Sequence, residues 1–167
     1  MPRLSDDPRE RAGEQKCLAD VEKYGLHVLR VFGDAEWPSF VYSVGLHRNF
    51  QIPEIIVLGL KQDLAHTVLN EIASRARSGE RFQVGDTIDG LLEGFKVVLR
   101  PVRDEFIEPH FGWDIWFYDG VPFPVAQLVW PTTSGVWPWE SNASDDFRAR
   151  QPLLETADVP TWVRRPS

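Results

Sequence analysis

Between residues 40 and 46 the side chains alternate in character, and Phe40, Tyr42 and Val44 stand at every second position. That period of two predicts a β-strand. Residues 55–60 form a continuous apolar run, which is typical of a strand buried on both faces. The loop expected between the two strands gathers His47, Arg48, Asn49 and Glu54, so it is the first candidate for a functional surface.

Two helices are predicted from apolar residues at helical spacing. The first begins at Pro8, carries Cys17, Val21 and Tyr24 on one face, and ends at Gly25. The second covers residues 65–76 and ends at Ser78 and Gly79. Its apolar stripe is formed by Ala65, Val68, Leu69, Ile72 and Ala76. We expect this stripe to pack against the strand of residues 55–60.

Further strands are expected at residues 26–32, 82–84, 95–102 and 123–130, with residues 85–94 as an acidic turn segment. An irregular short helix is expected over residues 104–111. Short turns between neighbouring strands favour antiparallel pairing. The pattern therefore predicts an α+β fold with one mixed, mostly antiparallel sheet of five to six strands, one long packing helix and shorter flanking helices.

The chain has 167 residues, of which 43% are hydrophobic, and this suffices for one domain with a core. We expect a disordered N-terminus over residues 1–8, a globular domain over residues 9–154 and a flexible tail over residues 155–167. The formal net charge of -7 repels phosphate backbones, and no basic patch is evident. Nucleic acid is therefore not expected as a partner.

The single cysteine, Cys17, excludes an intramolecular disulfide and favours a reducing compartment. Its place on the apolar face of the first helix indicates a core residue. No secretory h-region precedes it, and the longest apolar run is far too short to cross a bilayer. These features predict a cytoplasmic protein without a membrane partner.

Signatures of metal and cofactor sites are weak or missing in the sequence. The four histidines are dispersed at positions 27, 47, 66 and 110, and only His110 with Asp114 has ligand spacing on a helix, interrupted by Gly112. Neither a Walker-type loop nor a GxGxxG motif occurs. We therefore predict no metal and no cofactor.

Tyr42, Ser43, His47 and Glu54 lie within 13 residues of one another. A hydroxyl, an imidazole and a carboxylate are the groups of acid–base or nucleophilic chemistry. Ser43 lacks the Gly-x-Ser-x-Gly elbow of serine hydrolases. Glu54 has a second interpretation, as a solvated residue at the start of a strand, and the sequence leaves both open.

Aromatic residues are dense between residues 113 and 139. Most of them are expected in the core, because Trp and Tyr fill large volumes. Trp137 and Glu140 follow a polar turn, TTSG, and could instead line a cleft or a docking patch. Gln127 and Trp130 belong to the last strand, where a buried amide must be hydrogen-bonded and could be structural or could orient a ligand. The candidate binding residues are Tyr42, His47, Arg48, Glu54, Gln127, Trp130, Trp137 and Glu140.

Several segments in combination resemble a bacterial family known as domain of unknown function 4262. They are YSVGLHRNFQIPEIIVLGL, HTVLNEIASRARSGERF, LLEGFKVVLRPV, WFYDG, FPVAQLVWP and FRARQPLL, within residues 24–154. The resemblance implies a shared fold. It carries no activity and no catalytic residues over to this chain.

Three functions are compatible with these observations. The first is a binding or interaction module for a small molecule or a protein, acting through residues 47–54 and 137–140. The second is a small hydrolase that uses His47 as a base with Glu54 or Glu140 as its partner carboxylate. The third is a flavin-binding barrel, which only the order of the elements suggests.

Overall fold

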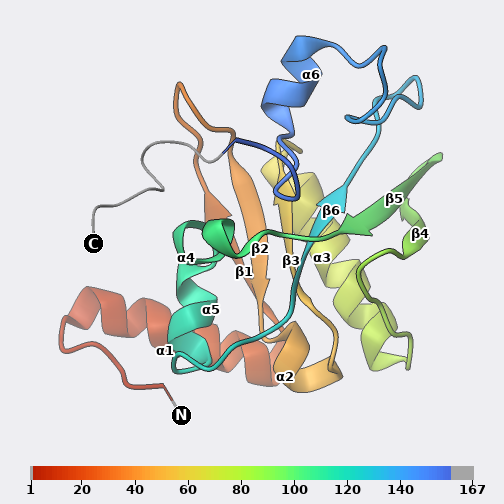
Figure 1. Ribbon diagram of the computed structural model, residues 1–167. Coiled ribbons are helices and arrows are strands. Elements are labelled where there is room, and N and C mark those ends of the chain that lie inside the picture. The colour runs from red at the N-terminus through yellow and green to blue at the C-terminus, as the bar shows by residue number, and fades with distance from the viewer. Residues whose placement is uncertain (1, 159–167) are drawn as a thin grey trace.

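A six-stranded sheet forms the centre of the computed structural model, which describes residues 2–158 (Figure 1). The strand order across the sheet is β1-β2-β3-β6-β5-β4. The strands are β1 (His27–Val31), β2 (Phe40–Val44), β3 (Glu54–Leu58), β4 (Thr87–Leu92), β5 (Phe95–Arg100) and β6 (Val125–Val129). β3 and β6 pair in parallel, and the other four neighbouring pairs are antiparallel. The predicted α+β fold with a mixed, mostly antiparallel sheet is confirmed.

Helices cover both faces of this sheet. They are α1 (Pro8–Tyr24), α2 (Leu46–Phe50), α3 (Gln62–Arg77), α4 (Ile107–His110), α5 (Gly112–Phe117) and α6 (Asp145–Arg150), with a 3₁₀ turn at Asp104–Phe106. The side chain of Asp7 caps α1 by accepting a hydrogen bond from the backbone of Arg9, and Gly25 ends α1 with φ of 90°. None of the helices among residues 2–158 is long and apolar enough to span a membrane.

Alternation along β2 and β3 divides the core between the two faces. Val41, Ile55 and Val57 pack with α3, as predicted for that helix. Tyr42 and Ile56 point to the other face, where α1, α4 and α5 supply the packing partners. The prediction that Tyr24 lies on the buried face of α1 is wrong, since this last residue of the helix is 52% exposed.

Two predicted loop segments are regular in the structure. Residues 46–50 form the short helix α2 because Gly45 takes a φ of 108° and turns the chain, so that Leu46 and Phe50, four residues apart, are both buried. Residues 87–92 form β4, whereas the expected strand at 82–84 is irregular. Ile88 pairs with Val97, and Gly94 allows the tight turn between β4 and β5.

The segment after α6 is held against the sheet by side chains. The Gln127 amide donates to the carbonyl of Pro152, and its oxygen accepts from the backbone of Leu154. Arg100 donates two hydrogen bonds to Glu155, at 2.9 and 2.7 Å. Residues 159–167, in the C-terminal part of the predicted tail, lie outside the described residues.

Replacing Leu69 with Ala should lower the free energy of unfolding by about 2 to 5 kcal/mol, because the side chain is fully buried between α3 and the sheet. Leu64 on the same helix is 40% exposed, so Leu64→Ala is a matched control with less than half that loss. Urea denaturation of both variants measures the difference. Equal losses would show that α3 is not docked through this face.

Candidate functional site

Glu54 begins β3 with a side chain that has no exposed surface. It is therefore not the solvated residue that was one of its two interpretations. Its carboxylate receives hydrogen bonds from side chains and from three successive backbone amides at the start of α2. The donors are Ser43 Oγ (2.7 Å), Gly45 N (2.9 Å), Leu46 N (3.1 Å), His47 N (3.4 Å) and Tyr118 Oη.

The directions of these bonds favour the ionised form of Glu54. Backbone amides can only donate, Ser43 Oγ already accepts from the backbone of Ile55, and Tyr118 Oη already accepts from that of Arg48. Both hydroxyls therefore donate their hydrogen to the carboxylate. Burial raises the pKa of Glu54, and it outweighs the bonds from Tyr118 and Ser43, which lower the pKa. The hydrogen bonds thus favour the ionised carboxylate, and burial opposes it.

Asp114 of α5 has the opposite environment. It is fully buried, and neither carboxyl oxygen has a hydrogen-bond partner among the described residues. Burial, together with the nearby charge of Glu54, raises the pKa of Asp114 well above its usual value. Burial likewise raises the pKa of the Cys17 thiol to about 12, which makes this cysteine the unreactive core residue that the sequence indicated.

Three of the predicted site residues meet at Tyr118. The hydroxyl of Tyr118 donates a hydrogen bond to Glu54 and accepts one from the backbone of Arg48. The centroid of the His47 ring lies 5.9 Å from that of the Tyr118 ring. Tyr42 belongs to the same face of the sheet, but its hydroxyl accepts from the backbone of Trp113. These residues form a hydrogen-bonded corner around the buried Glu54, in which His47 and Tyr118 are half-buried and Arg48 is exposed.

The remaining predicted residues serve other contacts. Gln127 and Trp130 anchor the segment after α6, since the Trp130 backbone donates to Gln151 and its indole donates to the carbonyl of Leu58. Glu140 accepts from the backbone of Trp137 at 2.7 Å. The ring of Trp137 stacks on Trp139 with centroids 5.1 Å apart.

The loop that carries Trp137 and Glu140 lies at the opposite end of the sheet from α2 (Figure 1). His47 and Glu54 are at the α2 end. The two groups therefore do not line one common pocket. Their role in binding stays a prediction, and each group would have to act by itself.

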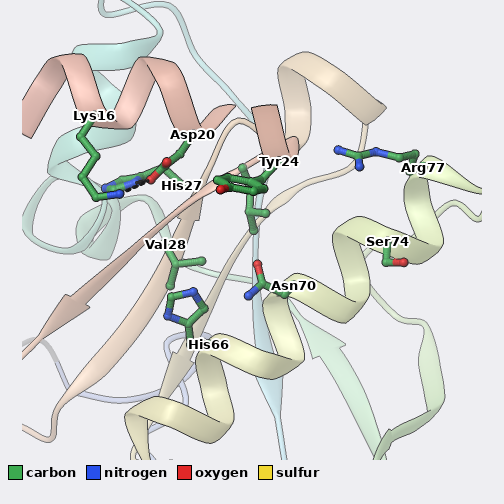
Figure 2. A pocket seen from close by; sticks show the side chains of 10 residues that line it. Lys16, Asp20, Tyr24, His27, Val28, His66, Asn70, Ser74 and Arg77 are labelled. Atoms are coloured by element: carbon green, nitrogen blue, oxygen red, sulfur yellow. Dashed lines mark hydrogen bonds and ion pairs between the residues drawn. The ribbon is translucent and has the colours of Figure 1, made fainter. Parts of the chain in front are cut away.

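A cleft of about 530 Å³ opens where α1, β1 and α3 meet. Its volume is within the range of small-molecule sites. Figure 2 shows α1 along one wall, α3 along the other, and β1 between them. The lining residues are Lys16, Asp20 and Tyr24 of α1, Leu26, His27 and Val28 at the start of β1, and His66, Asn70, Ser74 and Arg77 of α3.

On the α1 wall, Asp20 orients the imidazole of His27. The carboxylate lies 2.7 Å from His27 Nδ1 and 3.0 Å from the ammonium of Lys16. Burial raises the pKa of Asp20, but the bonds from His27 and Lys16 outweigh it and leave the pKa below its usual value. An ionised Asp20 fixes a proton on His27 Nδ1, so Nε2 is the nitrogen left for a ligand.

On the α3 wall, His66 is held as a neutral ring. Arg30 Nε lies 3.3 Å from His66 Nδ1, which accepts from the guanidinium. Burial and the charge of Arg30 lower the pKa of His66. With Nδ1 accepting, Nε2 carries the hydrogen and is a donor.

Arg77 is a cation of the cleft whose charge is not paired within residues 2–158. It makes no ion pair with any residue between 2 and 158, whereas the charge of Lys16 is shared with Asp20. Its Nη2 would lie 3.1 Å from a Cβ placed on Gly25, so the guanidinium sits beside the start of β1. The arrangement can donate hydrogen bonds to an anionic group and can orient it.

The histidines taken one by one give no sign of this cleft in the sequence. The polar residues of each wall do recur at helical spacing. Lys16, Asp20 and Tyr24 are four residues apart on α1, and His66, Asn70 and Ser74 are four apart on α3. Two such stripes next to one edge strand were the available signal. Among residues 2–158, no group of three His, Cys, Asp or Glu side chains is placed to hold a metal ion.

The chain belongs to the family DUF4262, a domain of unknown function, whose model matches residues 20–144. That range includes every lining residue of the cleft except Lys16, and it includes the corner around Glu54. No curated protein and no solved structure matches the chain.

Replacing Asp114 with Asn should flatten the dependence of stability on pH. When the pKa of a carboxyl group is higher in the folded state than in the unfolded state, the group contributes fully to stability below its unfolded pKa of about 3.9. This contribution is lost as pH rises through the pKa of the folded state. Above about pH 4, the free energy of unfolding of the variant should therefore rise relative to that of the parent by up to about 1.4 kcal/mol per pH unit.

Urea denaturation at several pH values between 4 and 8 measures this difference. Asp6→Asn is the control, because that side chain is 97% exposed and should show no such trend. A constant difference between the Asp114 variant and its parent across the range would contradict a raised pKa.

Proposed function

We propose that the chain is a binding module that takes a small molecule with an acidic group in the cleft between α1, β1 and α3. The observation that carries this proposal is the convergence of an unpaired arginine and two oriented imidazoles on one hollow. Convergent polar groups in a cleft are the usual mark of a ligand site.

Each wall supplies a different part of the recognition. Arg77 presents a guanidinium that can bind a carboxylate or phosphate through two hydrogen bonds. His66 Nε2 and the amide of Asn70 add neutral donors on the same helix. Leu26 and Val28 give the floor an apolar surface for the rest of the ligand.

The hydrolase alternative has less support, because its groups are engaged elsewhere. Glu54 is surrounded by donors inside the protein, so it is not free to act on His47. Glu140 is at the opposite end of the sheet, where it accepts from the backbone of Trp137. The flavin-barrel alternative also lacks support, since the sheet formed by residues 2–158 is open, with β1 and β4 at its edges.

Titration of ¹⁵N-labelled protein with benzoate, succinate and phenyl phosphate tests the proposal. At least one probe should shift the backbone amides of His27 and Val28 and the side-chain amide of Asn70. Arg77→Ala should weaken that binding about tenfold or more, because it removes a charged hydrogen-bond donor.

Arg9→Ala is the matched control. It removes the same charge from the exposed start of α1, where the Arg9 side chain makes no ion pair with residues 2–158. It should leave the affinity unchanged. Chemical-shift changes confined to other regions of the protein would refute an acidic-ligand site in this cleft. So would an equal loss of affinity in Arg77→Ala and Arg9→Ala.

A further inference from the structure

β1 is an edge strand whose outer side faces no other strand. Within the described residues it pairs with β2 alone. Every second residue of an antiparallel edge strand points its N–H and C=O groups away from the partner. β1 has no proline, and its only charged side chain apart from His27 is Arg30. The usual devices that block strand addition are therefore sparse along it.

Helix α3 packs on one face of the sheet, runs in the direction opposite to β1 and borders β1 at both ends of the strand. At the end of β1, the side chain of Gln62 donates to the carbonyl of Val31. Arg30 contacts Asp63 at 2.7 Å, in the first turn of α3. At the start of β1, Arg77 lies beside Gly25. Between these contacts, the groove formed by the helix and the strand is lined on the β1 side by residues 26–28.

The dimensions of the groove suit an extended chain. His66 and Arg77 are separated by about 16 Å along the helix axis, at 1.5 Å per residue. Five residues of extended chain span about 17 Å. A ligand with the length of β1 would therefore lie next to His66, Asn70 and Arg77 at once.

Charge then fixes the direction of that ligand. A strand added antiparallel to β1 ends where β1 begins, so its terminal carboxylate would come to lie next to Arg77. A parallel strand would place its amino terminus there, and two cations would repel each other. The opposite end of the groove carries the ion pair of Arg30 with Asp63, whose charges balance and do not oppose this direction.

We infer that the cleft takes an extended peptide with a free C-terminal carboxylate, which adds to the sheet as an antiparallel strand next to β1 and ends at Arg77. This inference rests on the proposed function and names the class of its ligand. Backbone pairing with β1 would supply affinity, and side chains alternating toward α3 would supply selectivity.

Selection from a random library of five-residue peptides with free carboxylates provides the probe. The most enriched peptide is then measured by fluorescence anisotropy as the acid and as the C-terminal amide. On the parent protein, the amide should bind about tenfold or more weakly than the acid. On Arg77→Ala this ratio should fall to about one, while Arg9→Ala should keep it.

N-methylation of the peptide, one backbone nitrogen at a time, tests strand pairing without altering the protein. Methyl groups should abolish binding at every second position and be tolerated at the positions between, because alternate N–H groups face β1. A uniform effect along the peptide, or an acid-to-amide ratio that Arg77→Ala leaves unchanged, would overturn the inference.

The two proposals fail in different ways. If no peptide is enriched but benzoate, succinate or phenyl phosphate still binds in an Arg77-dependent manner, the peptide is excluded and the acidic-ligand site remains. If neither probe binds in an Arg77-dependent manner, both proposals are wrong.

Discussion

The buried carboxylate of Glu54 is the interaction on which the arrangement of the site depends. By accepting from Gly45, Leu46 and His47, it satisfies the amides that the start of α2 leaves without partners. From α2, the side chain of Asn49 donates to two carbonyls of the α1 terminus, those of Val21 and Gly25, at 3.0 Å each. The carboxyl group at the start of β3 is thus linked through α2 to the end of α1. The end of α1 in turn sets the position of Asp20 and His27 in the cleft.

The corner around Glu54 and the cleft are therefore structurally connected. A buried carboxyl group is costly unless it is hydrogen-bonded, and the donors to Glu54 come from β2, the start of α2 and Tyr118, the residue after α5. The raised pKa of Asp114 favours its neutral form. With the corner fixed, α1 and α3 flank β1 and leave its edge open between them (Figure 2). The cleft therefore combines two helical walls, an open strand edge and an arginine that makes no ion pair with residues 2–158, and our binding proposal rests on this combination.

The sequence was sufficient for the parts of the fold that local patterns specify. The stripe on α3 and the apolar run of β3 identified the central packing, and Gly25 marked the end of α1. The helix α2 was missed because its main stabilising contact, to Glu54, comes from the following strand and has no local pattern. The cleft was missed for a related reason. His27 and His66 lie 39 positions apart, and only the topology that places β1 at the sheet edge brings α1 and α3 to either side of it.

The most direct test of this account is the ¹⁵N NMR spectrum of Glu54→Gln. An amide at this position would direct hydrogens at the donors of α2, so the short helix should lose its anchor. The account predicts shifts at Gly45 and Leu46 that extend through the side chain of Asn49 to Asp20 and His27 in the cleft. Shifts confined to residues 43–47, with the cleft unchanged, would contradict the claim that this carboxylate holds the site together.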